Sequence, residues 1–533
     1  MSTRSLLKSR MAGLMLGASL LAAPFIGAAQ AAEGALVVAR NMDVNSLDPA
    51  RGFCDTCQIY LSAVYETLLT LGDDNKTLVP KLATTWKANA DQTEFTFNLA
   101  PAAVFADGSP VTSADVAFSL QRLKNIKGDP SFLMDSVTAI ETPDDKTVVI
   151  KTNAPNSEFL GILAASYAGI VNKKLAEANG ASAADDAATA DTSDAWFFAH
   201  SAGSGPYTLA SYTADAELRF AANPNYWGKK PAIAEVIMKQ TADAVAQAQM
   251  LESGAADVAM QIDPDTAASL SNPDVVLDTV PSFNFLYVAL SPGAKGNTTP
   301  LTKPIREAIA LAIDYPAMID FTVGGKGKLQ PVAIPNGFPG TSDLPMPKED
   351  LDKAKALLAE AGVPDGFTIE AHYPAVNAYG VDISLMMQKV QQDLARIGVT
   401  INLTPTTFAV WREEVAGDGI PMTAVYYAPD YFGSAQYVQY FSMIEGNSWA
   451  KRAGAGKVEG VANPKEAELF KQAMAASGDA MDAAYKAIAL EMINDKIIIP
   501  LVSPDLVLAS RKGVKGVRYS ACCNLALDQL SRE

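Results

Sequence analysis

The cysteines are the residues of this sequence whose spacing most directly suggests chemistry. The chain has four: Cys54 and Cys57 form a C-x-x-C motif in "RGFCDTCQIY", and Cys522 and Cys523 are adjacent in "YSACCNLALD". Such a motif can form a redox centre, half of a metal site or a disulfide. The setting is not thioredoxin-like, although a helix-like segment follows, and adjacent cysteines rarely chelate one tetrahedral ion well. The motif therefore favours a disulfide if the chain enters an oxidising compartment.

No set of residues in the sequence resembles a catalytic centre. Only two histidines occur, His200 and His372, and they are far apart along the chain. The H-E-x-x-H, G-x-S-x-G and P-loop motifs are absent from the sequence. The glycine-rich segment "VGGKGK" (323–328) lacks the spacing of a phosphate-binding loop and is predicted to be a turn. We therefore predict a protein that is not an enzyme and that has no cofactor and no metal site.

The N-terminus has the pattern of a cleaved signal peptide, which we assign to residues 1–31. Three basic residues, Arg4, Lys8 and Arg10, precede an apolar run that ends in an A-x-A site at Ala31. No cysteine follows the run, so a lipid anchor is not expected there, and no later stretch is long and apolar enough for a membrane span. We therefore expect the protein to be periplasmic, and disulfides persist in that oxidising compartment.

The mature chain is strongly acidic. Removing the three basic residues of the leader changes the formal net charge from −17 to −20. Such a surface repels phosphate backbones and anionic lipids, so we expect no nucleic-acid partner and no binding to a membrane surface. A mature chain of about 500 residues exceeds one ordinary core, which predicts two or three domains.

Strand and helix patterns alternate along the chain, which predicts an α/β fold. Alternating apolar residues predict half-exposed strands at 93–99 and 146–152, and an apolar run predicts a buried strand at 497–502. Thr112 and Asp115 form a capping-box pattern that begins a helix with one buried face. Residues 176–204 are rich in Ala, Asp, Ser and Gly and are predicted to be a surface excursion. Further helices are predicted at 302–314, 347–362, 385–398, 463–474 and 479–496.

Several stretches, in order along the whole mature chain, resemble one family. They are "FTFNLAPAAVFADGSPVTSADVAFSLQRL" (95–123), "GSGPYTLASY" (203–212), "NPNYWGKKPAIAEVIMKQ" (223–240), "KPIREAIALAIDYPAMID" and "DLDKAKALLAEAGVPDGF". Through these stretches the chain resembles the extracytoplasmic solute-binding proteins of ABC importers. The class is the peptide/nickel type, solute-binding protein family 5, which includes dipeptide- and oligopeptide-binding proteins.

The resemblance implies a two-lobed periplasmic-binding-protein clamshell. Lobe one would comprise residues 32–72, 203–285 and 500–533, with residues 73–202 as an inserted subdomain, and lobe two would comprise residues 286–499. The chain would cross between the lobes near 282–290 and 497–505. A monomer of this kind would capture a small solute, most simply a short peptide, and deliver it to ABC permease subunits and their ATPase. The alternatives are an oligosaccharide, an opine or an amino-acid conjugate on the same fold, and more remotely a secreted hydrolase or a chaperone.

The resemblance also implies a ligand-binding segment, "YYAPDYFGSAQYVQYF" (426–441). Asp430 occupies the position of an aspartate that pairs with the ligand's amino group in peptide-binding relatives, since a buried ammonium needs a charged partner. Gly433 and Ser434 replace the family's common Asp-Pro, which leaves the ligand class open. Arg412 is a candidate partner for a ligand carboxylate. Candidate aromatic walls, at least half of them expected to be core, are Trp411, Tyr426, Tyr427, Tyr431, Tyr437 and Tyr440.

The clamshell further implies that both chain ends belong to lobe one. On that basis we predict two cross-links that join Cys54 and Cys57 to Cys522 and Cys523. Local pairs, 54–57 and a vicinal 522–523, are the alternative. Because the N-terminal segment approaches the ligand in this family, Phe53 is a further candidate ligand contact.

Overall fold

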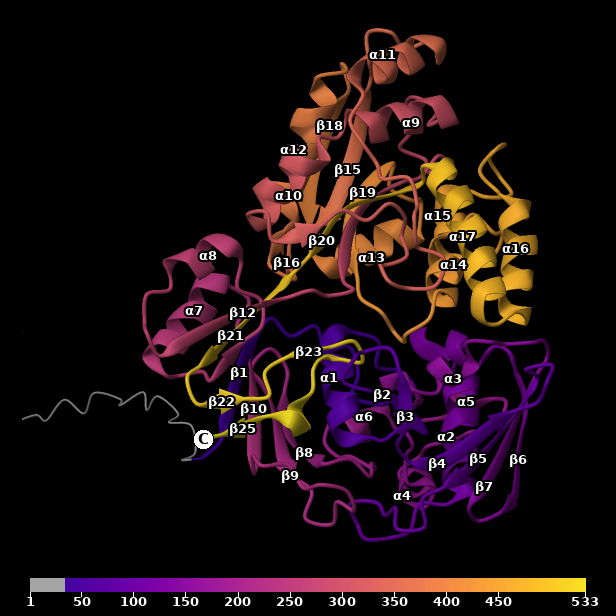
Figure 1. Ribbon diagram of the computed structural model, residues 1–533, viewed down its shortest axis with the longest axis vertical. Helices are drawn as coiled ribbons and strands as arrows, with labels where there is room; N and C mark the ends of the chain where they lie inside the picture. The colour runs from indigo at the N-terminus through magenta and orange to yellow at the C-terminus, as the bar shows by residue number, and fades with distance from the viewer. Residues whose placement is uncertain (1–33) are drawn as a thin grey trace, which may run out of the picture.

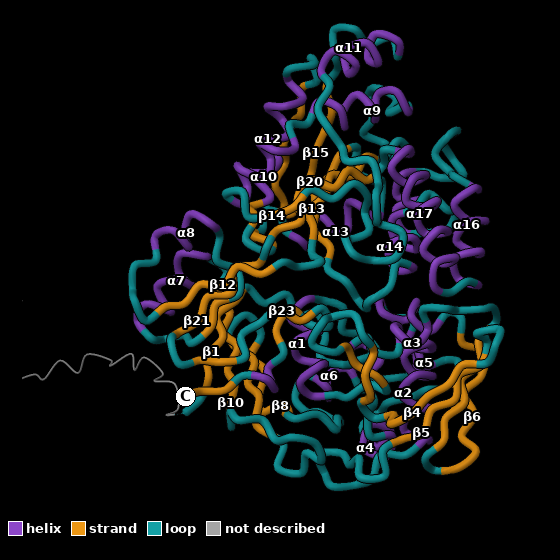
Figure 2. Tube along the Cα trace, viewed as in Figure 1, coloured by secondary structure: helices purple, strands orange, loops and turns teal. Residues whose placement is uncertain are grey.

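The computed structural model describes residues 34–533 and shows two lobes, one above the other in Figure 1. The lower lobe contains a seven-stranded sheet and a separate four-stranded sheet, and the upper lobe contains a six-stranded sheet. Helices and strands are mixed in both lobes (Figure 2), as the α/β prediction requires. The predicted signal peptide lies outside the described residues. Within the described part of the chain, no helix has the length and apolar character of a membrane span.

The seven-stranded sheet is centred on the first strand of the described chain. Strand β1 is buried along its whole length and pairs in parallel with β10 on one side and β11 on the other, which is typical of a strand covered on both faces. The sheet order is β12-β21-β11-β1-β10-β9-β8. The strands are β1 (Leu36–Arg40), β8 (Tyr207–Thr213), β9 (Glu217–Ala222), β10 (Glu235–Gln240), β11 (Val258–Ala259), β12 (Val275–Val280) and β21 (Leu506–Arg511), and the accompanying helices are α1 (Asp55–Val64), α7 (Ala244–Ser253) and α8 (Pro264–Ser269).

The four-stranded sheet is antiparallel, in the order β4-β5-β7-β6. Its strands β5 (Glu94–Leu99) and β7 (Thr147–Thr152) confirm the two predicted half-exposed strands. Helix α2 (Ser113–Ile126) begins at the predicted capping box, in which Thr112 N and Oγ1 both donate to Asp115 Oδ2, at 2.9 and 2.6 Å. The remaining elements of this region are β2 (Leu69–Leu71), β3 (Leu78–Pro80), β4 (Ala83–Ala88), β6 (Val137–Asp144), α3 (Phe159–Ile162) and the 3₁₀ turns Asp129–Met134 and Ser166–Ala168.

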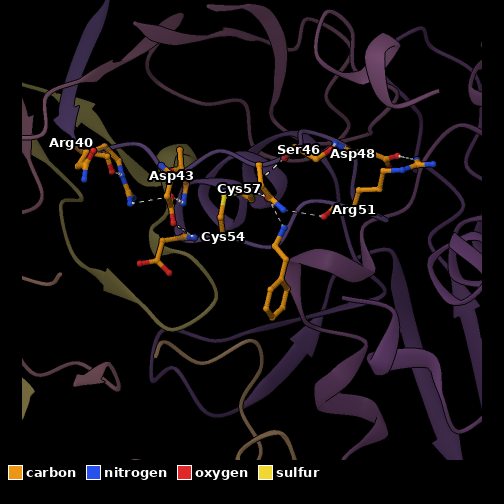
Figure 3. Close-up of a disulfide and its surroundings, with 12 residues drawn as sticks. Arg40, Asp43, Ser46, Asp48, Arg51, Cys54 and Cys57 are labelled. Carbon is orange, nitrogen blue, oxygen red and sulfur yellow. Dashed lines mark hydrogen bonds and ion pairs between the residues drawn. A yellow bond between two sulfur atoms is a disulfide. The ribbon is translucent and has the colours of Figure 1, made fainter. Parts of the chain in front are cut away.

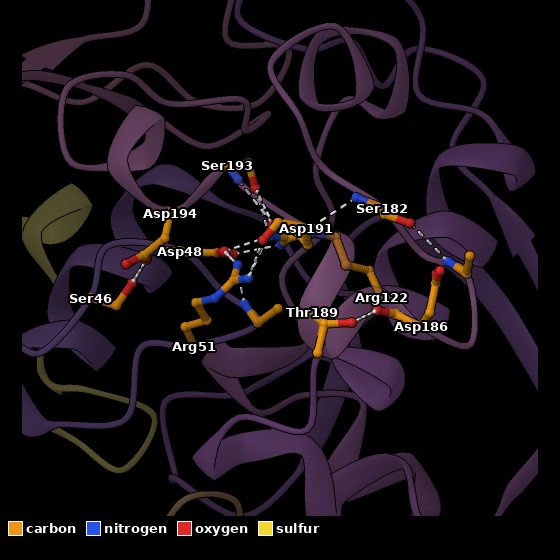
Figure 4. Close-up of polar contacts among 12 residues, drawn as sticks. Ser46, Asp48, Arg51, Arg122, Ser182, Asp186, Thr189, Asp191, Ser193 and Asp194 are labelled. Atoms are coloured by element: carbon orange, nitrogen blue, oxygen red, sulfur yellow. Dashed lines mark hydrogen bonds and ion pairs between the residues drawn. The ribbon is translucent and has the colours of Figure 1, made fainter.

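The segment 176–204 is more than the predicted surface excursion, because two of its residues anchor a buried ionic cluster. It contributes the end of α4 (Lys173–Ala178) and the short helices α5 (Ala187–Ala190) and α6 (Asp194–Phe197). Asp191 accepts a hydrogen bond from Arg122 Nε at 2.7 Å, and Ser193 Oγ accepts one from Arg122 Nη2 at 3.0 Å (Figure 4). Arg122 also pairs with Asp48. A buried guanidinium needs such partners, and composition alone does not reveal them.

The upper lobe is built on the sheet β14-β20-β13-β19-β15-β18. All the helices predicted for this half are present, and β20 confirms the predicted buried strand. The predicted turn in segment 323–328 is present at Gly324 and Gly325, with φ of 57° and 77°, between the end of α10 and strand β14. The strands are β13 (Phe285–Leu290), β14 (Gly327–Lys328), β15 (Thr368–Pro374), β16 (Asn377–Ala378), β17 (Val381–Asp382), β18 (Thr400–Thr406), β19 (Met422–Tyr427) and β20 (Ile498–Pro504). The helices are α9 (Lys303–Ala312), α10 (Tyr315–Val323), α11 (Leu351–Glu360), α12 (Ile383–Ala395), α13 (Phe408–Ala416), α14 (Ala435–Phe441), α15 (Ser448–Ala453), α16 (Pro464–Ala475) and α17 (Gly478–Asp495).

The chain passes between the two large sheets at β12–β13 and again at β20–β21. The C-terminal segment then returns to the lower lobe beside β1 (Figure 1). Its hairpin touches the first connection, because Phe283 N donates to Tyr519 Oη at 3.2 Å and Asn284 Nδ2 donates to Asn524 Oδ1 at 3.1 Å. The exact lobe boundaries stay a prediction. The C-terminal elements are β22 (Val514–Lys515), β23 (Tyr519–Ser520), β24 (Asn524–Leu525), the 3₁₀ turn Leu527–Gln529 and β25 (Ser531–Arg532).

Candidate functional site

The C-x-x-C motif forms a disulfide at the start of α1. Cys54 and Cys57 are bonded to each other, with their Cα atoms 4.9 Å apart (Figure 3). The predicted cross-links to Cys522 and Cys523 are therefore wrong, and so is the vicinal bond of the alternative, because these two cysteines are free with their Sγ atoms 2.8 Å apart. The helix turn already brings residues 54 and 57 into disulfide range, so the local bond does not need the chain ends to meet.

The two lobes touch through a surface that we call the interlobe surface, formed by residues 53–58 and 156–161 of the lower lobe and residues 426–436 of the upper lobe. Gln58 Nε2, in α1, donates to the carbonyl oxygen of Pro429 at 3.2 Å. Phe53 is partly exposed, and its ring lies against the rings of Tyr167 and Phe132, at centroid distances of 5.1 and 6.2 Å. The structure thus brings the N-terminal segment against the predicted ligand-binding segment.

Asp430 is buried at this surface, with 4% of its area exposed. Its backbone N donates to Gln436 Oε1 at 2.7 Å, which fixes the loop before α14. Its carboxylate accepts a single hydrogen bond from the described residues, from Tyr427 Oη at 2.9 Å. Burial raises the pKa of Asp430 to about 7, the Tyr427 hydrogen bond opposes that rise, and the negative charge of Asp55 adds to it. A buried carboxylate with so few donors favours a positively charged partner.

A second buried carboxylate, Glu158, reaches the same segment from the lower lobe. Its two oxygens accept hydrogen bonds from Ser434 N and Ala435 N, both at 2.8 Å, and Tyr431 Oη donates to it at 3.4 Å. Burial raises the pKa of Glu158 to about 7, although these donors favour the ionised form. The ring of Tyr431 is buried in the core of the lower lobe rather than in its own lobe. Glu158 and Tyr431 therefore join the two lobes.

The other candidates occupy different positions. Tyr426 and Tyr427 end β19 and are partly buried, and Tyr426 packs on Phe408 with ring centroids 6.0 Å apart. Trp411 lies in the upper-lobe core, where its indole N–H donates to Thr423 Oγ1 at 2.8 Å. Arg412 forms an ion pair across the lobes with Asp129 at 3.0 Å. Two further aromatics of the segment pack together around Phe441, Tyr437 fully buried and Tyr440 partly buried.

Neither histidine takes part in a metal site. Within residues 34–533, no group of three or more His, Cys, Asp or Glu side chains is arranged to hold a metal ion. His372 Nδ1 lies 3.0 Å from Glu414 Oε2, and His200 stacks on Trp196 with ring centroids 5.0 Å apart. The site thus offers carboxylates and aromatic rings, a chemistry suited to an organic cation.

The comparisons with known proteins decide the family. The model of the bacterial extracellular solute-binding proteins, family 5, matches residues 77–448. The chain belongs to this family. A curated relative, "Probable D,D-dipeptide-binding periplasmic protein DdpA" of Escherichia coli K12, is 28% identical over 494 residues, which is 91% of both chains.

Solved structures of similar shape confirm the two-lobed periplasmic-binding-protein fold. The dipeptide-binding protein of Pseudoalteromonas sp. SM9913, in complex with Met-Leu, has a TM-score of 0.81 and 20% identity, and covers 94% of this chain and 100% of its own. The protein AgaA of A. tumefaciens R10, in complex with agropinic acid, has a TM-score of 0.79 and 24% identity, with coverages of 94% and 99%. At these identities the likeness establishes the fold alone. Proteins of this fold therefore include one that binds a dipeptide and one that binds agropinic acid.

Three residues of this family 5 protein were not predicted: Glu158 and Asp55 at the interlobe surface, and Tyr379, which packs on Tyr426 of that surface. The sequence signal for the Glu158 contact was Gly433, which departs from the family's common Asp-Pro. A Cβ at that position would overlap the Glu158 carboxylate. Asp55 lies inside the "CDTC" motif that the cysteines made conspicuous. Tyr379 precedes Gly380 at a tight turn, and no sequence pattern marks its side chain as functional.

Proposed function

We propose that this family 5 protein is the periplasmic solute-binding component of an ABC importer and that its solute is a short peptide with a free amino group. Asp430 binds the ammonium group of the peptide, and Phe53, Tyr426 and Tyr427 provide apolar contacts around it. Trp411 supports the site from the core, and Arg412 acts through its ion pair between the lobes.

The observation that carries this proposal is the state of Asp430. Its carboxylate is buried between two lobes and has one hydrogen-bond donor among the described residues. An ammonium group supplies the missing charge and donors, and charge-assisted hydrogen bonds of this kind are among the strongest in proteins. The curated relative named as a dipeptide-binding periplasmic protein supports the same ligand class.

Capture and delivery follow from the fold. A solute that contacts both lobes stabilises the closed arrangement by its difference in affinity for the closed and open states. We propose that residues 1–31 direct the chain to the periplasm and are removed, and that the closed, loaded monomer docks on a permease. No step changes the solute chemically, in keeping with relatives that are binding proteins.

A thermal-shift screen tests the ligand class, because a ligand that binds the folded state raises Tm by mass action. Di- to pentapeptides should raise Tm of the mature protein, whereas oligosaccharides should not. If an opine or a glycan shifts Tm and every peptide fails, the peptide assignment is wrong while the family fold stands.

A further inference from the structure

Two carboxylates from opposite lobes approach each other at the interlobe surface. Asp55 lies in the first turn of α1, and Gln58, in the same helix, is hydrogen bonded to Pro429, the residue before Asp430. The charge of Asp55 is strong enough at Asp430 to raise the pKa of that group further. The hydrogen bond between Gln58 and Pro429 thus places both carboxylates at the same part of the interlobe surface.

Cationic side chains near these carboxylates are committed elsewhere. Arg40 Nη2 lies 3.8 Å from Asp43 Oδ1, and Arg412 is paired with Asp129. Within residues 34–533, neither Asp55 nor Asp430 has a Lys, Arg or His side chain at ion-pair distance. Asp55 and Asp430 thus have no cation of the described residues at ion-pair distance, although the charges of Asp43 and Arg40 act on Asp55 in opposite directions. Glu158, the third carboxylate of the surface, is satisfied by backbone N–H groups instead.

Tyr379 adds a hydroxyl at the same place. Its side chain is 7% exposed, and its Oη is buried without a hydrogen-bond partner among the described residues. The charge that acts on it most strongly is that of Asp55, which places the hydroxyl beside that carboxylate. Its ring stands edge-on to Tyr426, with centroids 5.3 Å apart. This buried hydroxyl is therefore available to a ligand group that also contacts Asp55.

The backbone of Tyr379 adopts a conformation that bulky residues seldom take. Tyr379 and Gly380 link β16 and β17, with φ of 55° and 83°. Two successive positive φ values are typical of a type I′ hairpin turn, in which Asn or Gly usually occupies the first position. A bulky residue in this region is an outlier. The turn itself does not need tyrosine. Its ring packs in the upper-lobe core, and its hydroxyl is the group that remains without a hydrogen-bond partner in the described part of the chain.

We propose that the solute carries two positively charged nitrogen groups, one bound by Asp430 and the other by Asp55 together with the hydroxyl of Tyr379. This inference rests on the proposed function, which supplies the first group at Asp430. A solute with one cation leaves one of the two carboxylates uncompensated, and a solute with two compensates both. A dipeptide with an N-terminal lysine has both groups, the α-ammonium and the side-chain ammonium.

Isothermal titration with matched dipeptides tests the inference. Lys-Ala and Met-Ala both carry a free α-ammonium and have side chains of similar length, but only lysine adds a second cation. The wild type should bind Lys-Ala at least about tenfold more tightly than Met-Ala, as expected for a charge-assisted contact in a partly desolvated site. Asp55→Asn should bring the affinity ratio of Lys-Ala to Met-Ala close to one, and Tyr379→Phe should reduce that ratio. The ratio is compared within each variant because removing the Asp55 charge also acts on Asp430. Asp91→Asn, which removes an exposed carboxylate from the same lobe, should leave the preference intact.

The outcomes separate this inference from the proposed function. Equal wild-type affinities for Lys-Ala and Met-Ala overturn the two-cation inference, and peptide binding stands. Retention of the preference by Asp55→Asn overturns the inference as well. If neither dipeptide binds, the peptide assignment fails, and 1,5-diaminopentane decides the inference. Its binding to the wild type but not to Asp55→Asn upholds two cation sites, and its failure to bind the wild type overturns them.

Discussion

Glu158 and Asp430 are two buried carboxylates of the same interlobe surface, and the donors around them differ. Burial raises the pKa of each to about 7. Glu158 accepts two backbone N–H groups and faces a tyrosine hydroxyl, whereas Asp430 accepts one tyrosine hydroxyl. A buried polar group that the protein satisfies holds structure together, and one that it leaves short of donors is ready for a ligand. The difference gives Glu158 the lobe contact and supports the solute-binding role that we propose for Asp430.

Glycine at position 433 makes the first of these roles possible. A Cβ on Gly433 would overlap the carboxylate of Glu158, and one on Gly161 would lie 2.9 Å from the carbonyl oxygen of Phe432. Two glycines, one in each lobe, therefore allow the backbones to approach closely enough for Glu158 to reach Ser434 N and Ala435 N. The departure from the common family residues at 433–434 thus has a structural explanation.

The largest effect on lobe closure is expected from disrupting the Glu158 contact. Gly433→Val should displace the Glu158 carboxylate and remove about 3 kcal/mol from lobe closure, because a buried charged group loses its donors. Dipeptide affinity should then fall on the order of 100-fold. Solution scattering in saturating dipeptide should show a larger radius of gyration than for the wild type.

Gly72→Ala is the matched control, since a Cβ there makes only ordinary contacts, the nearest at 3.4 Å. It should close like the wild type. If Gly433→Val also closes normally, Glu158 does not hold the lobes together, and the contrast with Asp430 loses its basis.

A change at Asp430 should act on binding more than on folding. Asp430→Asn removes the charge that pairs with the solute ammonium, and truncating such a buried contact typically costs about 2–5 kcal/mol. We expect calorimetric dipeptide affinity to fall by roughly 100-fold or more. Tm of the unliganded variant should stay level or rise, because an uncompensated buried carboxylate is gone. Unchanged affinity would rule out the assigned role.

The pH dependence should separate the two carboxylates more finely. Their folded pKa values of about 7 exceed the ordinary carboxyl values of about 4, so between these limits the folded state binds more protons than the unfolded state. The free energy of unfolding should therefore fall as pH rises from about 4 to about 7 and level off above that. Denaturant unfolding of Glu158→Gln and of Asp430→Asn should show that the free energy of unfolding falls less steeply with pH than in the wild type.

The pH dependence of peptide affinity should follow Asp430 more than Glu158. Affinity for Met-Ala should rise between about pH 5.5 and 7.5 as Asp430 ionises, and Glu158→Gln should keep that rise. The groups that act on Asp430 are Tyr427 and Asp55, and those that act on Glu158 include Tyr431 and Tyr485. Three other carboxyl groups also have raised pKa values: Asp55, Glu466 and Asp495. The quantity to compare is therefore the difference in affinity between the wild type and each variant at each pH. If the affinity of Asp430→Asn is lower but changes with pH in the same way as that of the wild type, Asp430 is not the group whose ionisation controls binding.

The smallest effect is expected from the cysteines. Alkylation of the unfolded protein without reductant should label two thiols, Cys522 and Cys523. Reduction of the Cys54–Cys57 bond should cost about 2 kcal/mol of unfolding free energy, because the loop that it closes is short. If no thiol is labelled, all four cysteines are paired in disulfides. If four thiols are labelled, the protein has no disulfide.

Features set by local sequence could be predicted, and those set by contacts between distant segments could not. The capping box of Thr112 and Asp115 was predicted correctly because its geometry depends on four consecutive residues. The cross-link between chain ends was wrong because it relied on the fold to bring the cysteines together, while the helix turn at Cys54 already satisfied the bond locally.

The candidate site shows the same division. Asp430 could be named as a candidate from its place in the resemblance to the family, but its partner segment could not. Glu158 meets Ser434 from 276 positions away, and only the unexplained Gly433 hinted at the contact. Trp411 and Tyr431 looked alike as ligand aromatics, yet one lies in the upper-lobe core and the other in the core of the opposite lobe.

The most direct measurement of the central claim is calorimetric titration of the wild type with Met-Ala and with N-acetyl-Met-Ala. Acetylation removes the ammonium group and leaves the rest of the ligand nearly unchanged. If Asp430 recognises that group, Met-Ala should bind and the acetylated peptide should bind at least about 100-fold more weakly. Equal affinity for the two peptides would show that the buried carboxylate does not recognise the amino group of the solute.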